Sequence, residues 1–344
     1  MTINNVIECL LCHGKAVLKK ENFPGFQEPS VFTIYHCSDC ETSFCVPHAV
    51  NTDKIYENIY KNPGFILGYD RYLNYSETVV HKKNPLKYLA DTEDIYWGVC
   101  EALKKIAKTG KIKSVFEVGS GLGYLTYALN KAGYQATGLD ISREAVSKAT
   151  EKYGNYYICD DLAEYALKHE GVYDVVICTE VIEHIVDPET FIKMLLLLVK
   201  PDGQVIVTTP NNSPFPDDII WYTDLPPVHR WWFSEKSLLF LAKKIGFEAD
   251  FIDFKKYYDR HLVQYSLVSR RNFDLVHSYF DRNDTPIVQE TVEQPLVKRL
   301  LEKVPFVMSV YRRYVAGVVN PDVFICKHKG NVLCSILRKS GSGR

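Results

Sequence analysis

Residues 115–140 read VFEVGSGLGYLTYALNKAGYQATGLD, and this stretch decides the fold. Its apolar start predicts a buried strand, the three closely spaced glycines predict a tight loop, and the segment after them predicts a helix. A second strand then ends in the acid Asp140. A strand, a glycine loop and a helix in this order are typical of a parallel α/β sheet that binds a nucleotide-like ligand where its strands end.

The glycine loop differs from a dinucleotide-binding loop. It reads Glu117-Val-Gly119-Ser-Gly121-Leu-Gly123, whereas G-x-G-x-x-G spacing would put the third glycine at Tyr124. The carboxylate of Glu117 also disfavours a pyrophosphate, because like charges repel. A ligand with a cationic end suits the loop better. S-adenosylmethionine is such a ligand, since it carries a sulfonium and an ammonium group and no phosphate.

With these residues the sequence resembles the class I S-adenosylmethionine-dependent methyltransferases. It is most similar to the ubiquinone-type O-methyltransferase branch and to the zinc-ribbon methyltransferases of bacterial glycan and secondary-metabolite pathways. The resemblance covers residues 112–254. Besides the glycine loop it rests on CDDL at 159–162, YDVVICTEVIEHIVDP at 173–188, LLLLVKPDGQVIVTTPN at 195–211 and PPVHRWWFSEKSL at 226–238.

The expected cofactor site lies where the parallel strands end, because ligands of open α/β sheets collect there. Glu117 and the glycines are expected to hold the methionine half, and Asp140 is placed to accept hydrogen bonds from the ribose hydroxyls. The resemblance implies that Asp161 lies against the adenine amino group, a role for which Asp160 competes. The complete expected set is Glu117, Gly119, Gly121, Gly123, Asp140, Ile141, Asp161, Leu162 and Thr179.

The alternation of strands and helices predicts a parallel sheet with crossover helices. The resemblance implies a Rossmann-like α/β fold around a seven-stranded sheet, mostly parallel, whose last strand inserts antiparallel beside the sixth. The first six strands are expected at 114–118, 135–139, 156–158, 175–178, 204–208 and 247–254 within a core of residues 111–254. The seventh is expected at Asp322–His328, beside the sixth. Residues 255–321 would then be a helical insertion, residues 322–344 the last strand and tail, and residues 51–110 an aromatic-rich helical segment.

Two C-x-x-C pairs, Cys9 with Cys12 and Cys37 with Cys40, precede the sheet. Four thiolates at this spacing make a closed tetrahedral zinc site, so residues 1–50 are expected to form a zinc ribbon that needs its metal to fold. The competing interpretation is four unrelated buried thiols. Four nearby side chains are alternative ligands: His13, His36, Cys45 and His48. The ten cysteines and the lack of an export signal indicate reduced thiols in the cytoplasm.

Two histidines are the candidate bases for methyl transfer to a hydroxyl, a reaction that requires a base or a metal ion. They are His184, in the E-V-I-E-H motif, and His229, in P-V-H-R-W. Glu180 and Glu183 are candidates to bind a divalent ion such as Mg²⁺, as is suspected in the quinone branch. The alternatives are that His184 only orients its loop and that the two acids cap a helix.

The leading hypothesis for function is O-methylation of a sugar, a glycan or another small metabolite, either free or lipid-linked. Three alternatives stay open: RNA methylation with the ribbon as the grip, C-methylation of a keto-sugar nucleotide, and an inactive cofactor-binding scaffold. The net charge of −1 argues against nucleic acid as a partner. The sequence does not indicate an oligomeric state.

Residues 296–313 combine apolar positions at helical spacing with Lys298, Arg299 and Lys303. This pattern predicts a basic amphipathic helix that can rest on an anionic membrane surface, or that simply presents a solvated face. The longest apolar runs are far shorter than the roughly 20 residues that span a bilayer. We therefore expect a cytoplasmic protein with peripheral contact at the inner face of the membrane.

Overall fold

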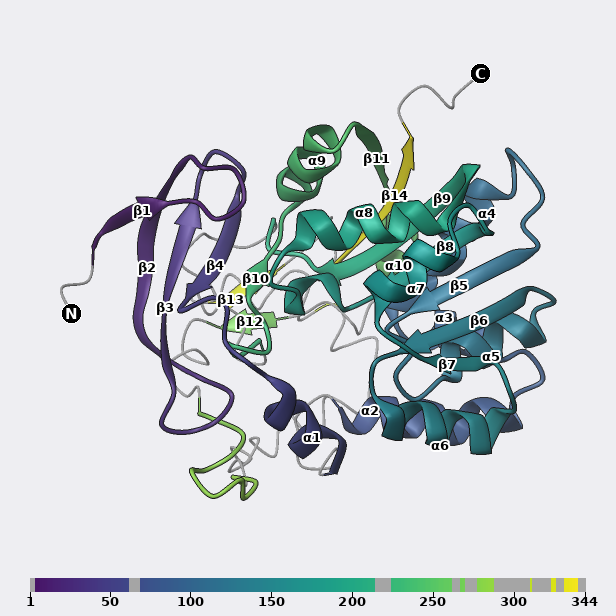
Figure 1. Ribbon diagram of the computed structural model, residues 1–344, viewed down its shortest axis with the longest axis horizontal. Coiled ribbons are helices and arrows are strands. Elements are labelled where there is room, and N and C mark those ends of the chain that lie inside the picture. The colour runs from purple at the N-terminus through teal and green to yellow at the C-terminus, as the bar shows by residue number, and fades with distance from the viewer. Residues whose placement is uncertain are drawn as a thin grey trace.

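The computed structural model describes residues 4–61, 69–213, 224–261, 267–269, 277–287, 310, 323–325 and 331–339. Two sheets dominate these residues, as Figure 1 shows: a small antiparallel sheet at the N-terminal end and a larger α/β sheet beside it.

The larger sheet has seven strands in the order β11-β14-β9-β8-β5-β6-β7. The neighbours from β9 to β7 pair in parallel, and β14 runs antiparallel to both β9 and β11, which confirms the predicted fold class. The first six predicted strands are confirmed, with β9 longer than expected. The strands are β5 (Ser114–Val118), β6 (Gln135–Asp140), β7 (Tyr157–Cys159), β8 (Tyr173–Thr179), β9 (Val199–Pro210), β11 (Phe247–Phe251) and β14 (Val332–Lys339).

The prediction for the seventh strand was wrong in its residues. Within Asp322–His328, β13 (Val323–Ile325) pairs instead with β12 (Leu267–Ser269) in a separate two-stranded sheet. The strand inserted beside the sixth is β14, and its residues 332–337 are all buried. A strand covered on both faces needs a run of buried side chains, and residues 332–337 form such a run.

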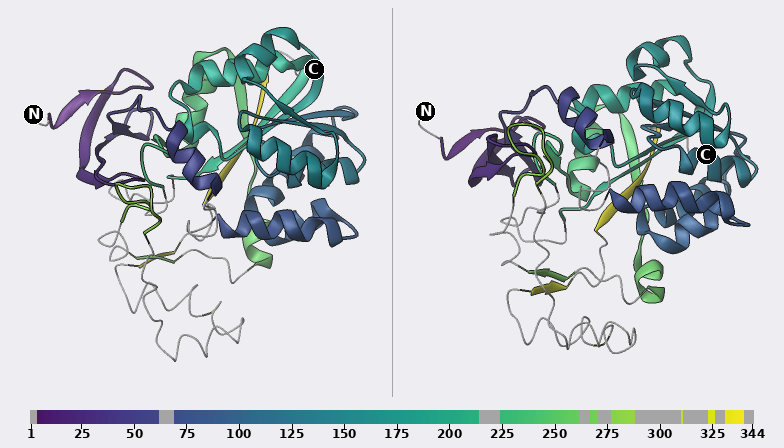
Figure 2. Two further views of the ribbon diagram at one scale, coloured as in Figure 1. Left: turned by 60° about the horizontal axis from the view of Figure 1, so that its bottom comes forward. Right: turned by 90° about the horizontal axis from the view of Figure 1, so that it is seen from below.

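Helices cover both faces of this sheet, as the two views of Figure 2 show. Successive residues of a strand point to opposite faces, so Val115 joins one apolar cluster and Phe116 the other. The first cluster includes α3 (Pro85–Thr92), α4 (Asp94–Ile106), α5 (Tyr124–Lys131) and α6 (Arg143–Tyr153). The second includes α7 (Leu162–Lys168), α8 (Pro188–Leu198) and α9 (Glu235–Lys244).

The structure also describes further helical segments. They are α1 (Asp53–Lys61), α2 (Asp70–Thr78), the 3-10 turns η2 (Val79–His81) and η3 (Ile182–His184), and α10 (Lys255–Arg260). Ile55 and Ile59 of α1 pack with Trp232 and with residues of the small sheet. Helix α1 therefore packs against the small sheet.

The small sheet has the order β1-β2-β3-β4-β10. Its N-terminal strands are β1 (Val6–Glu8), β2 (Lys15–Pro24), β3 (Val31–Cys37) and β4 (Thr42–Val46). The fifth strand, β10 (Trp231–Trp232), lies in the sequence between β9 and α9. It pairs antiparallel with β4. We call β1–β4 with their cysteine loops the ribbon. Because β10 completes its sheet, the ribbon is joined to the core by backbone hydrogen bonds as well as by side chains.

Most of the predicted basic helix at residues 296–313 lies outside the described residues. Among the helices that the structure describes, none has the length and apolar character that crossing a membrane requires.

Candidate functional site

The glycine loop turns sharply at the end of β5 and bonds to the end of β6. The amides of Gly119 and Ser120 both donate to the carbonyl of Leu139, at 2.8 and 3.0 Å. Gly119 has a φ of +75°, and a Cβ atom there would lie 2.5 Å from Cγ2 of Val181. This position therefore requires glycine for its backbone and for its close contact with the loop that follows β8.

Asp140 is held in place by the glycine loop that it faces. Its Oδ2 accepts a hydrogen bond from the amide of Gly121 at 2.7 Å, and its Oδ1 accepts one from the amide of Ser142 at 2.8 Å. Burial raises the pKa of this carboxyl. The next residue, Ile141, is 76% exposed. An oriented acid can accept hydrogen bonds from ribose hydroxyls, and an exposed apolar side chain beside it can pack against an adenine ring.

Glu117 lies under the loop and is only 3% exposed. Its carboxyl accepts a hydrogen bond from the hydroxyl of Thr126, a partner that the sequence did not indicate. Burial, and to a smaller extent the nearby charge of Asp140, raises the pKa of Glu117 to about 8. The group therefore holds a proton near neutral pH until a cation favours its charged form.

The end of the loop is closed by packing. Gly123 has a φ of +79°, and a Cβ atom there would lie 2.6 Å from Cβ of Ala149. The hydroxyl of Tyr157 donates to the carbonyl of Gly123 at 2.6 Å. The third glycine of the motif thus allows the loop to pack closely against α6 and β7.

The remaining predicted cofactor residues lie at the carboxyl ends of β7 and β8. Asp161 caps α7, and its Oδ1 accepts from the amides of Ala163 and Glu164 at 2.8 and 3.2 Å. Leu162 is the first residue of that helix, and Thr179 is the last residue of β8. Capping gives Asp161 a structural role in addition to the expected one, and its contact with adenine stays a prediction.

The two candidate bases, distant in sequence, lie in contact. The ring centroids of His184 and His229 are 4.5 Å apart in an edge-to-face arrangement. Nδ1 of His184 lies 2.8 Å from the carbonyl of Val228, so it carries the proton and leaves Nε2 as an acceptor. Burial lowers the pKa of His184 to about 4, and burial followed by the proximity of His184 lowers the pKa of His229. Both rings are therefore neutral at pH 7 and able to accept a proton.

An acid completes this cluster. Oε2 of Glu183 accepts a hydrogen bond from Thr209 at 2.9 Å, and burial raises the pKa of Glu183 to about 8. Its Oε1 lies 3.6 Å from Nε2 of His184 and has no hydrogen-bond partner in the part of the chain that is described. Asp224, which the sequence did not single out, has Oδ2 3.9 Å from Nδ1 of His229.

The ligand atoms of Glu183, His184 and His229 all lie within 4.8 Å of one another, close enough to share a metal ion. Two imidazoles and a carboxylate suit Zn²⁺, Mn²⁺ or Fe²⁺ better than Mg²⁺, which prefers oxygen ligands. Glu180, the other acid considered for a divalent ion, is not part of this group. Its φ is +53°, and its Oε1 accepts a hydrogen bond from Thr208 at 2.9 Å.

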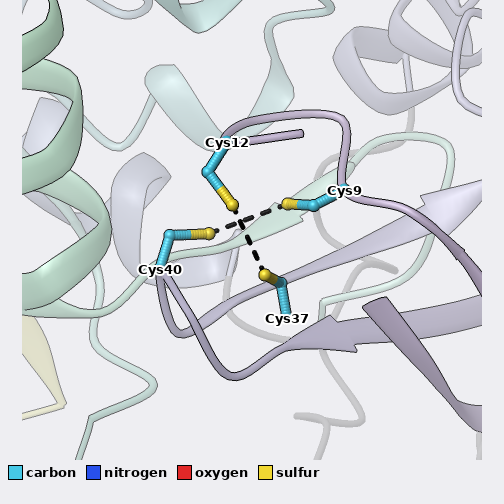
Figure 3. Close-up of side chains that lie close together, drawn as sticks. All are labelled: Cys9, Cys12, Cys37 and Cys40. Atoms are coloured by element: carbon cyan, nitrogen blue, oxygen red, sulfur yellow. Dashed lines mark hydrogen bonds between the residues drawn. The ribbon is translucent and has the colours of Figure 1, made fainter. Parts of the chain in front are cut away.

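The four predicted metal ligands converge at one end of the ribbon, as Figure 3 shows. The sulfur atoms of Cys12 and Cys37 are 3.4 Å apart, those of Cys9 and Cys40 are 3.7 Å apart, and all four lie within 4.8 Å of one another. A zinc ion with bonds of about 2.3 Å to four sulfurs implies edges of about 3.8 Å between them. The donors therefore fit a tetrahedral zinc ion.

The alternative ligands have other partners. Nδ1 of His13 lies 2.7 Å from Glu8, and Nδ1 of His36 lies 3.0 Å from Ser43. Cys45 and His48 contact backbone carbonyls. Burial raises the pKa of the Cys12 thiol to about 11, a tendency that a bound cation reverses.

The part of the chain that carries these residues is similar to known proteins. Residues 93–250 match the model of a family described as a methyltransferase domain. Over 141 residues the chain is 32% identical to a ubiquinone biosynthesis O-methyltransferase of Escherichia fergusonii, a match that covers 39% of this chain and 53% of the relative. The chain thus spans about half the length of the curated relatives it matches.

Solved structures with detectable similarity include two S-adenosylmethionine-dependent methyltransferases. One, from Thermotoga maritima and described as a possible histamine N-methyltransferase, has a TM-score of 0.43 and 16% identity, with 83% of this chain and 99% of that chain covered. The other, from Archaeoglobus fulgidus, has a TM-score of 0.42 and 15% identity, with 70% and 92% covered. Scores at this level carry no argument about function.

Residues 93–250 are therefore a methyltransferase domain. This match agrees with the resemblance seen in the sequence, which predicts an S-adenosylmethionine-dependent methyltransferase core.

Proposed function

We propose that this protein transfers the methyl group of S-adenosylmethionine to a hydroxyl of a sugar, a glycan or another small metabolite, free or lipid-linked. The observation that carries the proposal is the contact between His184 and His229. Val181, three residues before His184, closes against Gly119. The loop that carries His184 therefore borders the place where the methionine half of the cofactor is expected.

The cofactor supplies an activated methyl group, and the protein supplies alignment and a proton acceptor. Glu117 pairs with the ammonium group, and Asp140 orients the ribose. As the acceptor oxygen forms its bond to the methyl carbon, the bond from that carbon to sulfur breaks and the hydroxyl proton passes to the histidine pair. Neutral histidines suit this step because a protonated imidazole cannot take up the proton.

The names of the curated relatives support oxygen as the acceptor atom, since these proteins are described as O-methyltransferases. The proposal also includes a structural zinc ion held by Cys9, Cys12, Cys37 and Cys40. A divalent ion at Glu183, His184 and His229 is a second way to activate the hydroxyl, because a cation lowers the pKa of a bound hydroxyl. Mn²⁺, Zn²⁺ and Mg²⁺ are the ions to add back after chelation.

The test is to incubate the protein and methyl-labelled S-adenosylmethionine with host extract, and then to separate lipid, glycan, small-molecule and RNA fractions. Label in one of the first three fractions supports the proposal, and label in RNA overturns it. Asp140→Ala is the control, since loss of the ribose contact should abolish labelling while the fold persists. No label together with no binding of S-adenosylmethionine would favour a scaffold.

Residues 296–313 remain the proposed membrane contact. Flotation with vesicles that contain anionic lipid should show binding that weakens with salt, since charge attraction of this kind is screened. Flotation equal to that of neutral vesicles at every salt concentration would contradict it.

A further inference from the structure

We call residues 180–187, between β8 and α8, the histidine loop. The ribbon and the histidine loop are joined by the segment that directly follows His229. Arg230 comes next, and β10 begins at Trp231. Trp231 pairs with Phe44 of β4, and the amide of Cys45 donates to the carbonyl of Arg230 at 3.1 Å. One of the two candidate bases is thus fixed at the start of a strand that belongs to the ribbon's sheet.

Arg230 connects three segments that are far apart in sequence. It is 3% exposed, and its Nε donates to the carbonyl of His184 at 3.0 Å. Its Nη1 and Nη2 donate to the carbonyls of His48 and Val50, the latter at 2.6 Å. Its backbone amide donates to the carbonyl of Glu183 at 2.9 Å. The guanidinium therefore holds the end of the ribbon and the histidine loop at a fixed spacing.

This arrangement is specific to arginine. A buried cation requires polar partners, and here carbonyl groups from two segments supply them. The planar guanidinium donates in several fixed directions at once, whereas a lysine ammonium is a single point with flexible geometry. Arg230→Lys therefore keeps the charge and loses the simultaneous contacts.

Trp231 adds a second connection to the same loop. Its Nε1 donates to the carbonyl of Ile185 at 2.7 Å, and it is 2% exposed. Its ring packs edge-on against His48, with centroids 4.5 Å apart. Side chains from two successive residues thus bond to two successive carbonyls of the histidine loop.

The cysteine site lies at the other end of the same strands. The hydroxyl of Ser237, in the first turn of α9, donates to the carbonyl of Cys40 at 3.1 Å and accepts from Thr42 at 2.7 Å. Cys40 lies in the turn between β3 and β4, directly before Thr42 begins the strand that pairs with β10. The turn that carries Cys40 is therefore connected through β4 to the backbone of Arg230.

We propose that Arg230 is a positioning residue of the methyl-transfer site, and that the ribbon acts through it and Trp231 to hold His184 against His229. The inference rests on the proposed function. It gives the ribbon a role in the acceptor half of the site that goes beyond stabilising the fold.

The test compares Arg230→Lys with Lys236→Ala. Lys236 also joins the core to the ribbon, through Glu41 at 3.5 Å and the carbonyl of Ser38 at 3.3 Å, but it does not contact the histidine loop. Protein labelled with ¹⁵N at its ten histidines reports the tautomer of each ring by NMR, and His184→Gln identifies the signal of His184.

In wild-type protein and in Lys236→Ala, the signal of His184 should show a proton fixed on Nδ1. In Arg230→Lys it should become a mixture of tautomers, and the amides of His184 and Ile185 should exchange about tenfold faster, as expected when a hydrogen bond to a charged group is lost. The dissociation constant for S-adenosylmethionine, measured by calorimetry, should stay within about twofold, because the glycine loop makes none of these contacts.

An unchanged tautomer and unchanged exchange in Arg230→Lys would overturn the inference. If that variant does not fold, Trp231→Phe takes its place, since it keeps the ring and removes only the donor to Ile185. Faster exchange at Ile185 supports the inference, and wild-type exchange overturns it. None of these readouts requires methyl transfer, so a failure of the proposed function is recognised separately by the absence of S-adenosylmethionine binding or of labelling.

Discussion

The glycine loop and the histidine pair lie at the same edge of the central sheet, but they are held there in different ways. Most of the cofactor half comes from the continuous stretch 117–141, in which Asp140 bonds to Gly121 and Glu117 bonds to Thr126. The acceptor half is assembled from separate segments, with Arg230 bridging to His48 and His184.

This difference indicates how the two halves respond to damage. A change within the loop should alter cofactor binding and leave the histidines in place. A change in the ribbon should disturb the histidines and leave cofactor binding nearly intact. Separate measurements of cofactor affinity, methyl transfer and stability therefore test whether the two halves respond independently.

The largest effect is expected at the cysteine site. Cys40→Ser replaces one of the four clustered sulfurs, and a structural zinc site contributes its binding free energy directly to folding. We expect loss of the bound zinc and a free energy of unfolding lower by several kcal/mol, while binding of S-adenosylmethionine is retained. Elemental analysis, thermal unfolding and calorimetry measure the three quantities.

Cys159→Ser is the matched control for that variant, because Cys159 is exposed and distant from the four sulfurs. It should keep the metal and the wild-type melting temperature. A Cys40→Ser protein with full zinc content would show that the four cysteines do not bind the ion together.

The next effect concerns the acceptor half alone. His184→Gln and His229→Gln each remove a ring from the pair, and loss of a general base typically lowers the rate by about 10²- to 10⁴-fold. Label transfer into the acceptor fraction should fall by this amount in at least one of the two variants, with the affinity for S-adenosylmethionine unchanged. The variant with the larger loss identifies the base, and full activity in both would exclude the pair from the chemistry.

The residues of the expected cofactor half carry signals that are local in the sequence. The spacing of Gly119, Gly121 and Gly123 and the acid at 140 can be recognised without knowledge of the fold, and the structure brings them together. The spacing of the four cysteines also predicted their clustering. In each of these cases the residues that make the site lie in short motifs.

The acceptor half could be predicted only in part. His184 and His229 were expected near the site, but their mutual contact, the proximity of Asp224 and the bridging by Arg230 depend on the pairing of β10 with β4, which no local pattern encodes. The seventh strand was missed for a similar reason. The choice between residues 322–328 and Val332–Lys339 depends on which segment is buried on both faces, and short apolar runs do not distinguish the two.

A moderate effect is expected in the cofactor half at Gly119→Ala. A non-glycine residue at a φ of +75° costs about 1–2 kcal/mol, and the added Cβ atom would also press on Val181. The dissociation constant for S-adenosylmethionine should rise at least about tenfold. Gly171→Ala is the matched control, since its φ is +68° and no atom lies within 4 Å of the added Cβ. Equal affinities in the two variants would mean that the shape of the loop does not govern binding.

The smallest effect tests the charge of the cofactor half. Burial raises the pKa of Glu117 to about 8, so at pH 7 most of the free protein carries a proton there. Pairing with the ammonium group of S-adenosylmethionine favours the ionised carboxylate and lowers this pKa. Binding should therefore release close to one proton more in wild-type protein than in Glu117→Gln. The difference should vanish near pH 9, where the free protein is already ionised.

Calorimetry in two buffers with different ionisation enthalpies measures this release, and using the same ligand cancels the titration of its own amino group. The sign follows from linkage: a proton lost on binding makes the affinity of wild-type protein rise with pH up to about 8, relative to that of Glu117→Gln. At pH 7 the substitution should weaken binding only a few-fold, because ionising a group one pH unit below its pKa already costs the wild-type protein about 1.4 kcal/mol. Equal proton release by the two proteins would show that Glu117 does not pair with the cation, and the cofactor half would then depend on the shape of its loop alone.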